Sequence, residues 1–221
     1  MKKRSLVLLS GGLDSAYSLT VAHRDTDVVY GLCFDYGQAS AKQEIRASRQ
    51  ICVRFGIPHK VMPLPFFSDI THHPLLGKEP LPELNMNELD DKTKTTQSAK
   101  AVWVPNRNGI FLNIAAGLAE MIEVDFLYTG FNVEEAGTFP DNTQDFVSAL
   151  NHCFTFSTLH NVMVQSPPIK MTKTQIVAEL VKQNFPFELL WSCYRGGEQM
   201  CGLCESCLRL KRALNACGLQ A

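Results

Sequence analysis

The stretch "VLLSGGLDSAYSL", residues 7–19, decides the fold and raises the first question about function. A hydrophobic run ends there, and "SGGLDS" (10–15) follows before a helical pattern begins. Glycines let the backbone approach a ligand closely, and successive N–H groups at a helix N-terminus attract an anion. The stretch therefore predicts a strand–loop–helix unit that binds a phosphate-like group.

This loop differs from the two commonest nucleotide-binding loops. It matches neither G-x-x-x-x-G-K-[ST] nor G-x-G-x-x-G, so it lacks the lysine that normally addresses the β- and γ-phosphates. The structural alternative is a tight turn with Asp14 or Ser15 as the helix N-cap. The complete S-G-G-x-D-S after an N-terminal strand favours anion binding.

Short β-branched or aromatic runs alternate with helical patterns along the chain. We expect strands at 5–9, 28–34, 60–64, 125–131 and 162–165, and helices at about 14–24, 40–55, 109–122 and 172–183. This alternation predicts the α/β class, with a doubly wound parallel sheet and helices on both faces. Ligands bind such sheets outside the carboxyl ends of the strands, where the glycine loop also lies.

The chain divides into a main domain, residues 1–190, and a four-cysteine appendage, residues 191–221. Residues 65–100 of the main domain carry prolines and mixed charges without sustained periodicity. That composition predicts a structureless stretch, either a mobile loop covering the site or a disordered one. His72 and His73 fall in this stretch, and we assign them no functional role.

Composition excludes several classes of protein. The 221 residues are 45% hydrophobic and 19% charged, which is typical of a globular soluble chain. A net charge of −1 gives no general electrostatic reason to expect a nucleic-acid partner. No run approaches ~18 apolar residues, and the N-terminus lacks a cleavable small-residue site. We therefore expect a cytoplasmic protein without a membrane partner. The apolar run 109–124 suits a homodimer interface or a buried core helix.

Half of the eight cysteines gather near the C-terminus in the spacing C-x7-C-x2-C-x2-C. Four thiolates, from Cys193, Cys201, Cys204 and Cys207, form the closed tetrahedral set of a structural zinc site. An iron–sulfur cluster is an alternative. A redox C-x-x-C pair is disfavoured, because the motif does not lie at a thioredoxin-like strand–helix junction. We interpret the others, Cys33, Cys52, Cys153 and Cys217, as small buried apolar residues.

The loop "SGGLDS" (10–15) is similar to the pyrophosphate loop of the adenine-nucleotide α-hydrolase superfamily, whose members cleave ATP to AMP and pyrophosphate. The resemblance implies that a substrate oxygen attacks the α-phosphate. The loop would hold the leaving pyrophosphate, with Mg²⁺ spreading its charge, so no Walker lysine is needed. The implied ATP contacts are Leu8, Leu9, Ser10, Gly11, Gly12, Leu13, Asp14, Ser15, Ala16, Tyr17 and Ser18.

The order of motifs resembles the 7-cyano-7-deazaguanine synthase family over nearly the whole chain. The matching stretches are "LLSGGLDS" (8–15), "CFDYGQ" (33–38), "VPNRN" (104–108), "FPDN" (139–142) and "WSCYRGGEQMCGLCESCLR" (191–209). The resemblance implies an ATP-dependent ligase of queuosine biosynthesis that adenylates 7-carboxy-7-deazaguanine and then its amide, and forms the nitrile with ammonia. Leu13 replaces the family's frequent Gln, and Phe139 and Asn142 depart from its "YPDC", where we expect substrate contacts.

The resemblance also implies roles for four side chains. Asp14 and Ser15 would serve the pyrophosphate and its magnesium. Arg107 would face a phosphate or the substrate carboxylate, because its planar fork suits both; an ion pair between loop and helix is the alternative. Asp141 would contact the purine-like base or magnesium, or simply cap a helix.

Four further residues have weaker signals. Asp35, Tyr36 and Gln38 follow a strand end, where they would line the adenosine pocket or form a turn. Lys173 could reach phosphates, but we interpret it as a solvated lysine in the first turn of a helix.

Two rival functions stay open. One is a tRNA-thiolating or tRNA-modifying enzyme with the same loop, which the near-neutral composition disfavours. The other is a non-catalytic nucleotide-binding module held together by zinc.

Overall fold

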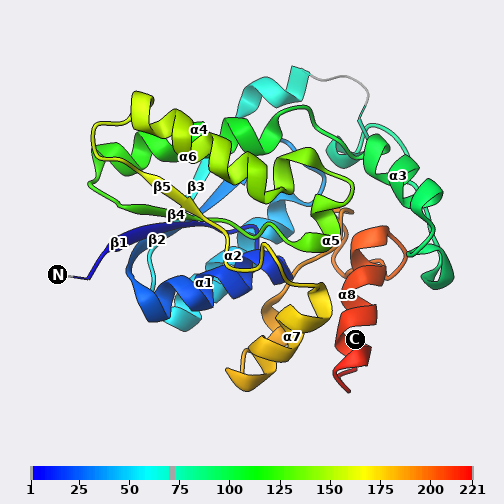
Figure 1. The fold of residues 1–221 in the computed structure, drawn as a ribbon. Coiled ribbons are helices and arrows are strands. Elements are labelled where there is room, and N and C mark those ends of the chain that lie inside the picture. Colours follow the sequence, from blue (N-terminus) through cyan, green and yellow to red (C-terminus); the bar gives the residue numbers. More distant parts are fainter. Residues whose placement is uncertain (1, 70–72, 221) are drawn as a thin grey trace.

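One parallel sheet organises the computed structural model, which describes residues 2–69 and 73–220 (Figure 1). Its strand order is β3-β2-β1-β4-β5, and every neighbouring pair is parallel. The strands are β1 (Arg4–Leu8), β2 (Asp27–Asp35), β3 (His59–Pro63), β4 (Phe126–Tyr128) and β5 (Met163–Gln165). All five strands predicted from the sequence are confirmed, and β4 is shorter than predicted.

Helices cover both faces of the sheet, as the α/β prediction requires (Figure 1). One face carries α1 (Leu13–Asp25), α2 (Ala41–Phe55), α7 (Lys173–Lys182) and α8 (Glu205–Ala216). The other carries α4 (Arg107–Met121) and α6 (Gln144–Ser157). The chain changes faces between β3 and β4, so β1 and β4 lie side by side at the topological switch point.

The central strand shows why the sheet is buried on both sides. Successive side chains of a strand point to opposite faces. Leu6 packs in the core under α4 and α6, and its neighbour Val7 packs in the core under α1 and α7; both are fully buried. The continuous apolar run of the opening motif is the signature of such a strand.

The stretch 65–100 is not structureless, which corrects the prediction. It contains three short 3₁₀ turns, at Pro65–Asp69, Pro74–Leu76 and Met86–Glu88, and the helix α3 (Lys92–Ala101). Leu75 and Leu76 are buried in the main core. His73 caps one turn and bonds to the Trp103 carbonyl at 3.0 Å, whereas His72 lies outside the described residues. The mobility of this stretch stays a prediction.

The cysteine-rich end packs against the sheet domain. Leu210, Ala213 and Leu214 of α8 join the core that α1 and α7 form. The Trp191 amide donates to the Gly11 carbonyl at 2.9 Å, so this end of the chain reaches the glycine loop itself. The boundary near residue 190 remains a prediction.

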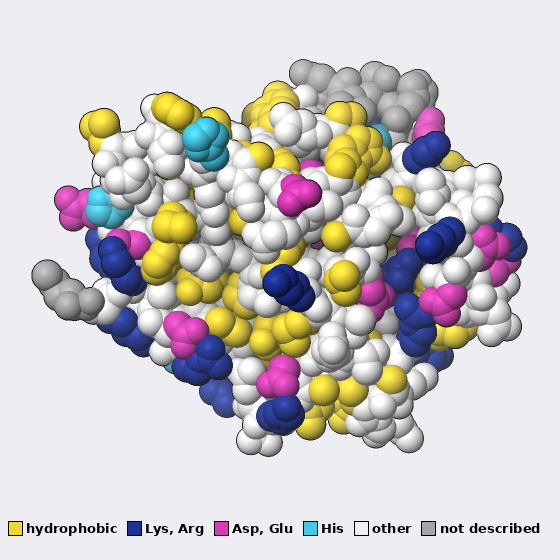
Figure 2. All heavy atoms as spheres, in the orientation of Figure 1, with side chains coloured by type: hydrophobic (Ala, Val, Ile, Leu, Met, Phe, Trp, Pro, Cys, Tyr) yellow, Lys and Arg dark blue, Asp and Glu magenta, His cyan; other side chains and the backbone are white. Residues whose placement is uncertain are grey.

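Two surface features bear on partners. None of the helices in the described part of the chain has the length and hydropathy that crossing a bilayer requires. On the face drawn in Figure 2, Lys and Arg side chains lie interspersed with Asp and Glu.

Candidate active site

A cleft opens at the carboxyl ends of β1, β2 and β4, at the switch point of the sheet. Its walls come from the glycine loop, the first turns of α2 and α4, the turns after β4, and the segment that precedes the cysteine cluster. Open α/β sheets bind their ligands in this crevice. The cleft is therefore the candidate active site.

Close backbone approach shapes the glycine loop. Gly11 has φ 83°, and a Cβ there would lie 2.6 Å from the Ala47 Cβ. A Cβ on Gly130, after β4, would lie 2.6 Å from the Ser15 nitrogen. Gly12 precedes α1 without any side-chain cap, which leaves the N–H groups of the first helical turn to a ligand.

Serine hydroxyls surround this helix start. The Ser10 and Ser15 hydroxyl oxygens lie 3.2 Å apart, and Ser15 also donates to the Gly12 carbonyl at 3.1 Å. Both residues line the cleft. Ser18 instead donates to the Thr129 carbonyl at 2.6 Å and is fully buried, so it ties α1 to β4. Ser10 and Ser15 are thus placed to bind an anion.

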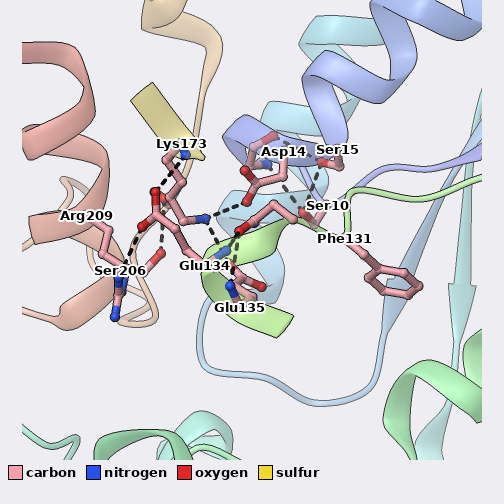
Figure 3. A network of polar contacts seen from close by, with 12 residues as sticks. Ser10, Asp14, Ser15, Phe131, Glu134, Glu135, Lys173, Ser206 and Arg209 are labelled. Carbon is pink, nitrogen blue, oxygen red and sulfur yellow. Dashed lines mark hydrogen bonds and ion pairs between the residues drawn. The ribbon is translucent and has the colours of Figure 1, made fainter. Parts of the chain in front are cut away.

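A buried ion-pair network joins the glycine loop to α5 (Val133–Ala136) and α7 (Figure 3). Lys173 Nζ donates to Asp14 Oδ2 at 2.6 Å and to Glu135 Oε1 at 2.8 Å, and its side chain is only 9% exposed. The prediction of a solvated lysine is wrong. Thr172 and Gln175 form a capping box that starts α7 at Lys173, whose amide donates to Glu134 Oε1 at 2.8 Å. These contacts aim the side chain into the site.

The surroundings shift the pKa values of Asp14 and Lys173. Burial raises the pKa of Asp14 to about 6, against the opposing effect of Lys173. Burial also opposes the charge of Lys173, but Asp14 and Glu135 outweigh it and raise the pKa of the ammonium. Asp14 Oδ1 is buried without a partner among the described residues. An unpaired carboxylate oxygen fits a hard cation such as Mg²⁺.

The network continues to α8 (Figure 3). Arg209 Nη1 lies 3.2 Å from Glu134 Oε2, and its Nη2 lies 2.8 Å from Glu205 Oε1. Glu134 therefore binds the Lys173 amide with one oxygen and α8 with the other. The helix that carries Cys207, and that Cys204 precedes as N-cap, is thus linked to the glycine loop through the side chains of Arg209, Glu134 and Lys173.

The opposite wall carries Arg107 and Asp141. Arg107 starts α4 and donates to the Tyr36 hydroxyl at 3.1 Å, with its guanidinium carbon 5.6 Å from the centre of that ring. Burial raises the pKa of Asp141, and Arg107 partly offsets the shift. Asn142 donates to Asp141 Oδ1 at 2.9 Å. The residue that departs from the family's "YPDC" thus orients this carboxylate.

Aromatic rings supply flat apolar surfaces in the same cleft. Phe34 and Phe111 stack with centroids 4.3 Å apart, and Tyr36 lies 5.4 Å from Phe111. Trp103 and Phe139 are nearly parallel, with an interplanar angle of 12°. Such walls suit a planar heteroaromatic ring, with the polar groups fixing its orientation.

The four clustered cysteines converge as predicted. The sulfurs of Cys193, Cys201, Cys204 and Cys207 all lie within 4.8 Å of one another. Backbone amides point at two of them: Arg195 and Cys201 donate to Cys193 Sγ at 3.3 and 3.4 Å, and Leu203 and Cys204 to Cys201 Sγ at 3.4 and 3.3 Å. These donors stabilise thiolates, and the set fits a four-coordinate metal ion.

Comparison with known proteins identifies the family. The model of the family described as "Queuosine biosynthesis protein QueC" matches residues 4–218. The chain belongs to the QueC family. A 7-cyano-7-deazaguanine synthase of Methanosarcina barkeri is 44% identical over 221 residues, which cover 98% of this chain and 96% of the relative. Its counterpart in Pelotomaculum thermopropionicum is 47% identical over 218 residues, 98% and 99% of the two chains.

The fold also resembles solved structures at low sequence identity. The chain is similar to the U34-tRNA thiolase NcsA of Methanococcus maripaludis, solved with its [4Fe-4S] cluster. That match has a TM-score of 0.46 and 16% identity, and covers 84% of this chain and 59% of the thiolase.

Membership in the QueC family confirms the predicted resemblance, and the structure brings most of the predicted site residues together. The cleft is lined by Leu8, Leu9, Ser10, Gly12, Leu13, Asp14, Ser15, Tyr36, Arg107 and Asp141. Gly11, Ala16, Tyr17 and Ser18 are not among the lining residues. Asp35 and Gln38 form the turn after β2, accepting from the Gly37 and Tyr36 amides at 3.1 and 2.9 Å.

Sequence reasoning missed several residues of this QueC-family site. The cleft is also lined by Glu44, Thr129, Glu135 and Tyr194. Of these, only Glu135 could have been predicted from the sequence, because it is an acidic residue shortly after the strand that pairs with β1. Cys153 is exposed and Cys217 half-buried, so the prediction that both are buried is wrong. Cys33 and Cys52 are buried as predicted.

Proposed function

We propose that this protein is an ATP-dependent 7-cyano-7-deazaguanine synthase. It converts 7-carboxy-7-deazaguanine and ammonia to the nitrile in queuosine biosynthesis, and it releases AMP and pyrophosphate. The observation that carries the proposal is the S-G-G-L-D-S helix start at the switch point, facing Arg107 and Asp141 across one cleft in a QueC-family chain.

The reaction explains why one loop can serve two steps. The substrate carboxylate attacks the α-phosphorus of ATP, and pyrophosphate leaves. Ammonia then displaces AMP and loses a proton, giving the amide. The amide oxygen attacks the α-phosphorus of a second ATP and a second pyrophosphate leaves; loss of AMP with the two amide protons then gives the nitrile. Each step replaces a poor oxygen leaving group by AMP.

The loop residues would hold the leaving pyrophosphate. Ser10 and Ser15 offer hydroxyl donors, and the uncapped first turn of α1 offers N–H groups where negative charge collects. Asp14 would hold Mg²⁺ through its unpaired oxygen, and the ion supplies charge neutralisation on the phosphates. Lys173 keeps the buried Asp14 carboxylate in place and partly balances its charge.

The opposite wall would hold the acid. Arg107 presents a planar guanidinium to a phosphate or to the substrate carboxylate. Asp141, fixed by Asn142, is placed to contact the base or the magnesium ion. Tyr36 orients Arg107 from the strand β2 side.

We infer that the cysteine cluster binds structural Zn²⁺. Four protein thiols close the tetrahedral set and leave no position for a catalytic water. The Trp191 indole donates to the Cys193 carbonyl at 2.9 Å and lines the cleft, so the cluster would support one wall of the substrate pocket.

The remaining proposals concern partners. We expect a cytoplasmic enzyme of small molecules without a nucleic-acid partner, in keeping with the net charge of −1. The apolar run 109–124 belongs largely to the core, through Leu112, Ala115 and Ala119. We propose a homodimer, to which Met121, 82% exposed at the end of α4, would contribute apolar surface.

The test is a reaction with 7-carboxy-7-deazaguanine, ¹⁵N-ammonium and ATP, followed by mass spectrometry. The account predicts a nitrile that carries one ¹⁵N. Binding of ATP without any turnover would favour the non-catalytic module instead. Retention of tRNA at moderate salt, with ATP cleavage that depends on the tRNA, would favour a tRNA-modifying enzyme.

A further inference from the structure

We propose that Glu44 recognises the aminopyrimidinone edge of the substrate base, accepting hydrogen bonds from its ring N–H and its 2-amino group. The inference rests on the proposed function, because it concerns the same cleft and the base that the proposed substrate carries. It assigns a role in substrate specificity to the start of α2, a part of the cleft wall that the proposed reaction does not use.

The carboxylate of Glu44 is held in a fixed orientation. Glu44 lies in the first turn of α2 and lines the cleft. Its Oε1 accepts from the Ser40 hydroxyl at 2.6 Å, and its Oε2 accepts from Gln38 Nε2 at 3.0 Å. Ser40 and Gln38 are 3% and 4% exposed, and Gln38 also bonds to the Tyr36 amide and the Phe34 carbonyl. Each carboxylate oxygen keeps a lone pair for another donor.

Glu44, which is half-buried, has no salt-bridge partner among the described residues. The charge of Arg107 acts on Glu44 from a distance, because it opposes the rise that burial causes in the pKa of Glu44, but the guanidinium donates to the Tyr36 hydroxyl and forms no ion pair with Glu44. Asp14 and Glu135, by contrast, share Lys173. Even partial burial of a carboxylate without a salt bridge is costly. The cost is understandable if a ligand supplies the missing donors.

The surroundings suit a flat ring. Phe34 and Phe111 form a stacked pair in the cleft, and Tyr36 lies against Phe111. The backbone of Phe34 and Tyr36 holds the same Gln38 that fixes Glu44. A base stacked on these rings would therefore meet the carboxylate with one edge.

The hydrogen-bond donors on the edge of the base determine which base fits Glu44. Because Ser40 and Gln38 both donate to Glu44, both of its oxygens act as acceptors toward the cleft. A guanine-type edge presents two adjacent donors, the ring N–H and the 2-amino group. The edge of adenine presents one donor and one acceptor, so it matches only half of this site. The observations therefore favour the deazaguanine substrate over the adenine of ATP.

The experiment combines one variant with one analogue. Wild type and Glu44→Gln are titrated calorimetrically with 7-carboxy-7-deazaguanine and with the analogue that lacks the 2-amino group. Wild type should prefer the full substrate by roughly ten- to a hundredfold, because the analogue leaves a buried acceptor unpaired. Glu44→Gln should reduce that preference to within about threefold. The exposed control Glu188→Gln should keep the wild-type preference.

The preference is a ratio measured within one protein, so a partly unfolded preparation does not change it. Glu44→Asp, which keeps both acceptors, should retain part of the preference. An unchanged preference in Glu44→Gln would overturn the inference while leaving nitrile formation intact. Weaker ATP binding with unchanged substrate preference would assign Glu44 to adenine. A wild-type protein that neither binds the acid nor forms the nitrile would overturn the proposed function itself.

Discussion

The cysteine cluster and the glycine loop are assembled in different ways. The cluster is assembled from residues 193–207, and the amides that point at its sulfurs come from the same short stretch. The glycine loop depends on distant parts of the chain: Lys173 lies 159 residues from Asp14, and Gly130 and Trp191 close on the loop from later segments. A local motif specifies the first site, whereas the tertiary fold completes the second.

The two regions are nevertheless connected. Arg209 of α8 binds Glu134, and Glu134 binds the backbone of Lys173, whose side chain reaches Asp14. Damage to the glycine loop should therefore abolish chemistry directly. Damage to the cysteine cluster should act through the position of the C-terminal wall.

The largest effect is expected from Asp14→Ala. The variant loses the carboxylate that we assign to magnesium, so AMP formation should fall by about 10³-fold or more. Its circular dichroism spectrum should match that of wild type. The matched control is Asp145→Ala, an exposed acid in the first turn of α6, which should keep full activity. A folded Asp14→Ala enzyme that turns over like wild type would refute the assignment.

Lys173→Gln should have the next largest effect. Removing the ammonium leaves two half-buried carboxylates uncompensated, Asp14 at 17% and Glu135 at 35% exposure, which should lower the free energy of unfolding by about 1–3 kcal/mol. Denaturant titration measures the change. Lys182→Gln, which removes an exposed lysine of the same helix, should unfold at the wild-type midpoint. Equal midpoints for the two variants would show that the network contributes nothing to stability.

Cys204→Ala tests the structural role of the cysteine cluster. One missing thiolate should weaken zinc binding by at least about 100-fold, loosen the last thirty residues of the chain, and weaken substrate use more than ATP binding. Metal analysis and activity are measured on the same preparation, with the exposed Cys153→Ala as control. Full activity without zinc would contradict the structural role. Iron with a visible absorption band would replace zinc by a cluster.

A smaller effect should appear in the pH dependence of stability without magnesium. The pKa of Asp14 is about 6 in the folded protein and near 3.9 in an unfolded chain. The folded state therefore binds more protons between these values, and the stability that this group contributes falls as pH rises from about 4 to about 6. Asp14→Asn should remove a change on the order of 2 kcal/mol across that window. Parallel curves for the two proteins would contradict the assignment.

Local patterns explain what could be predicted from the sequence. The five strands and the helices α1, α2, α4 and α7 were predicted from apolar runs and apolar patterns within each segment. The cysteine ligands lie so close along the chain that spacing alone indicates their convergence. α6 also had a readable pattern, because Val147, Leu150 and Phe154 share its buried face, but it was not predicted.

Other features left no local signal. α3 buries Thr95, Ser98 and Ala99, so it shows no apolar stripe, and only the N-cap Asp91 marks its start. Lys173 looks like any lysine in a first helical turn until the fold brings two carboxylates to it. Glu44 gains its significance only because α2 starts beside the cleft.

The central claim is that the glycine loop holds pyrophosphate, so that ATP is cleaved at its α-phosphate. The direct measurement follows ATP labelled in its β- and γ-phosphates during turnover with 7-carboxy-7-deazaguanine and ammonium. The account predicts that the label first appears as pyrophosphate, with two AMP formed for each nitrile. ADP as the nucleotide product, or orthophosphate as the first labelled product, would contradict it.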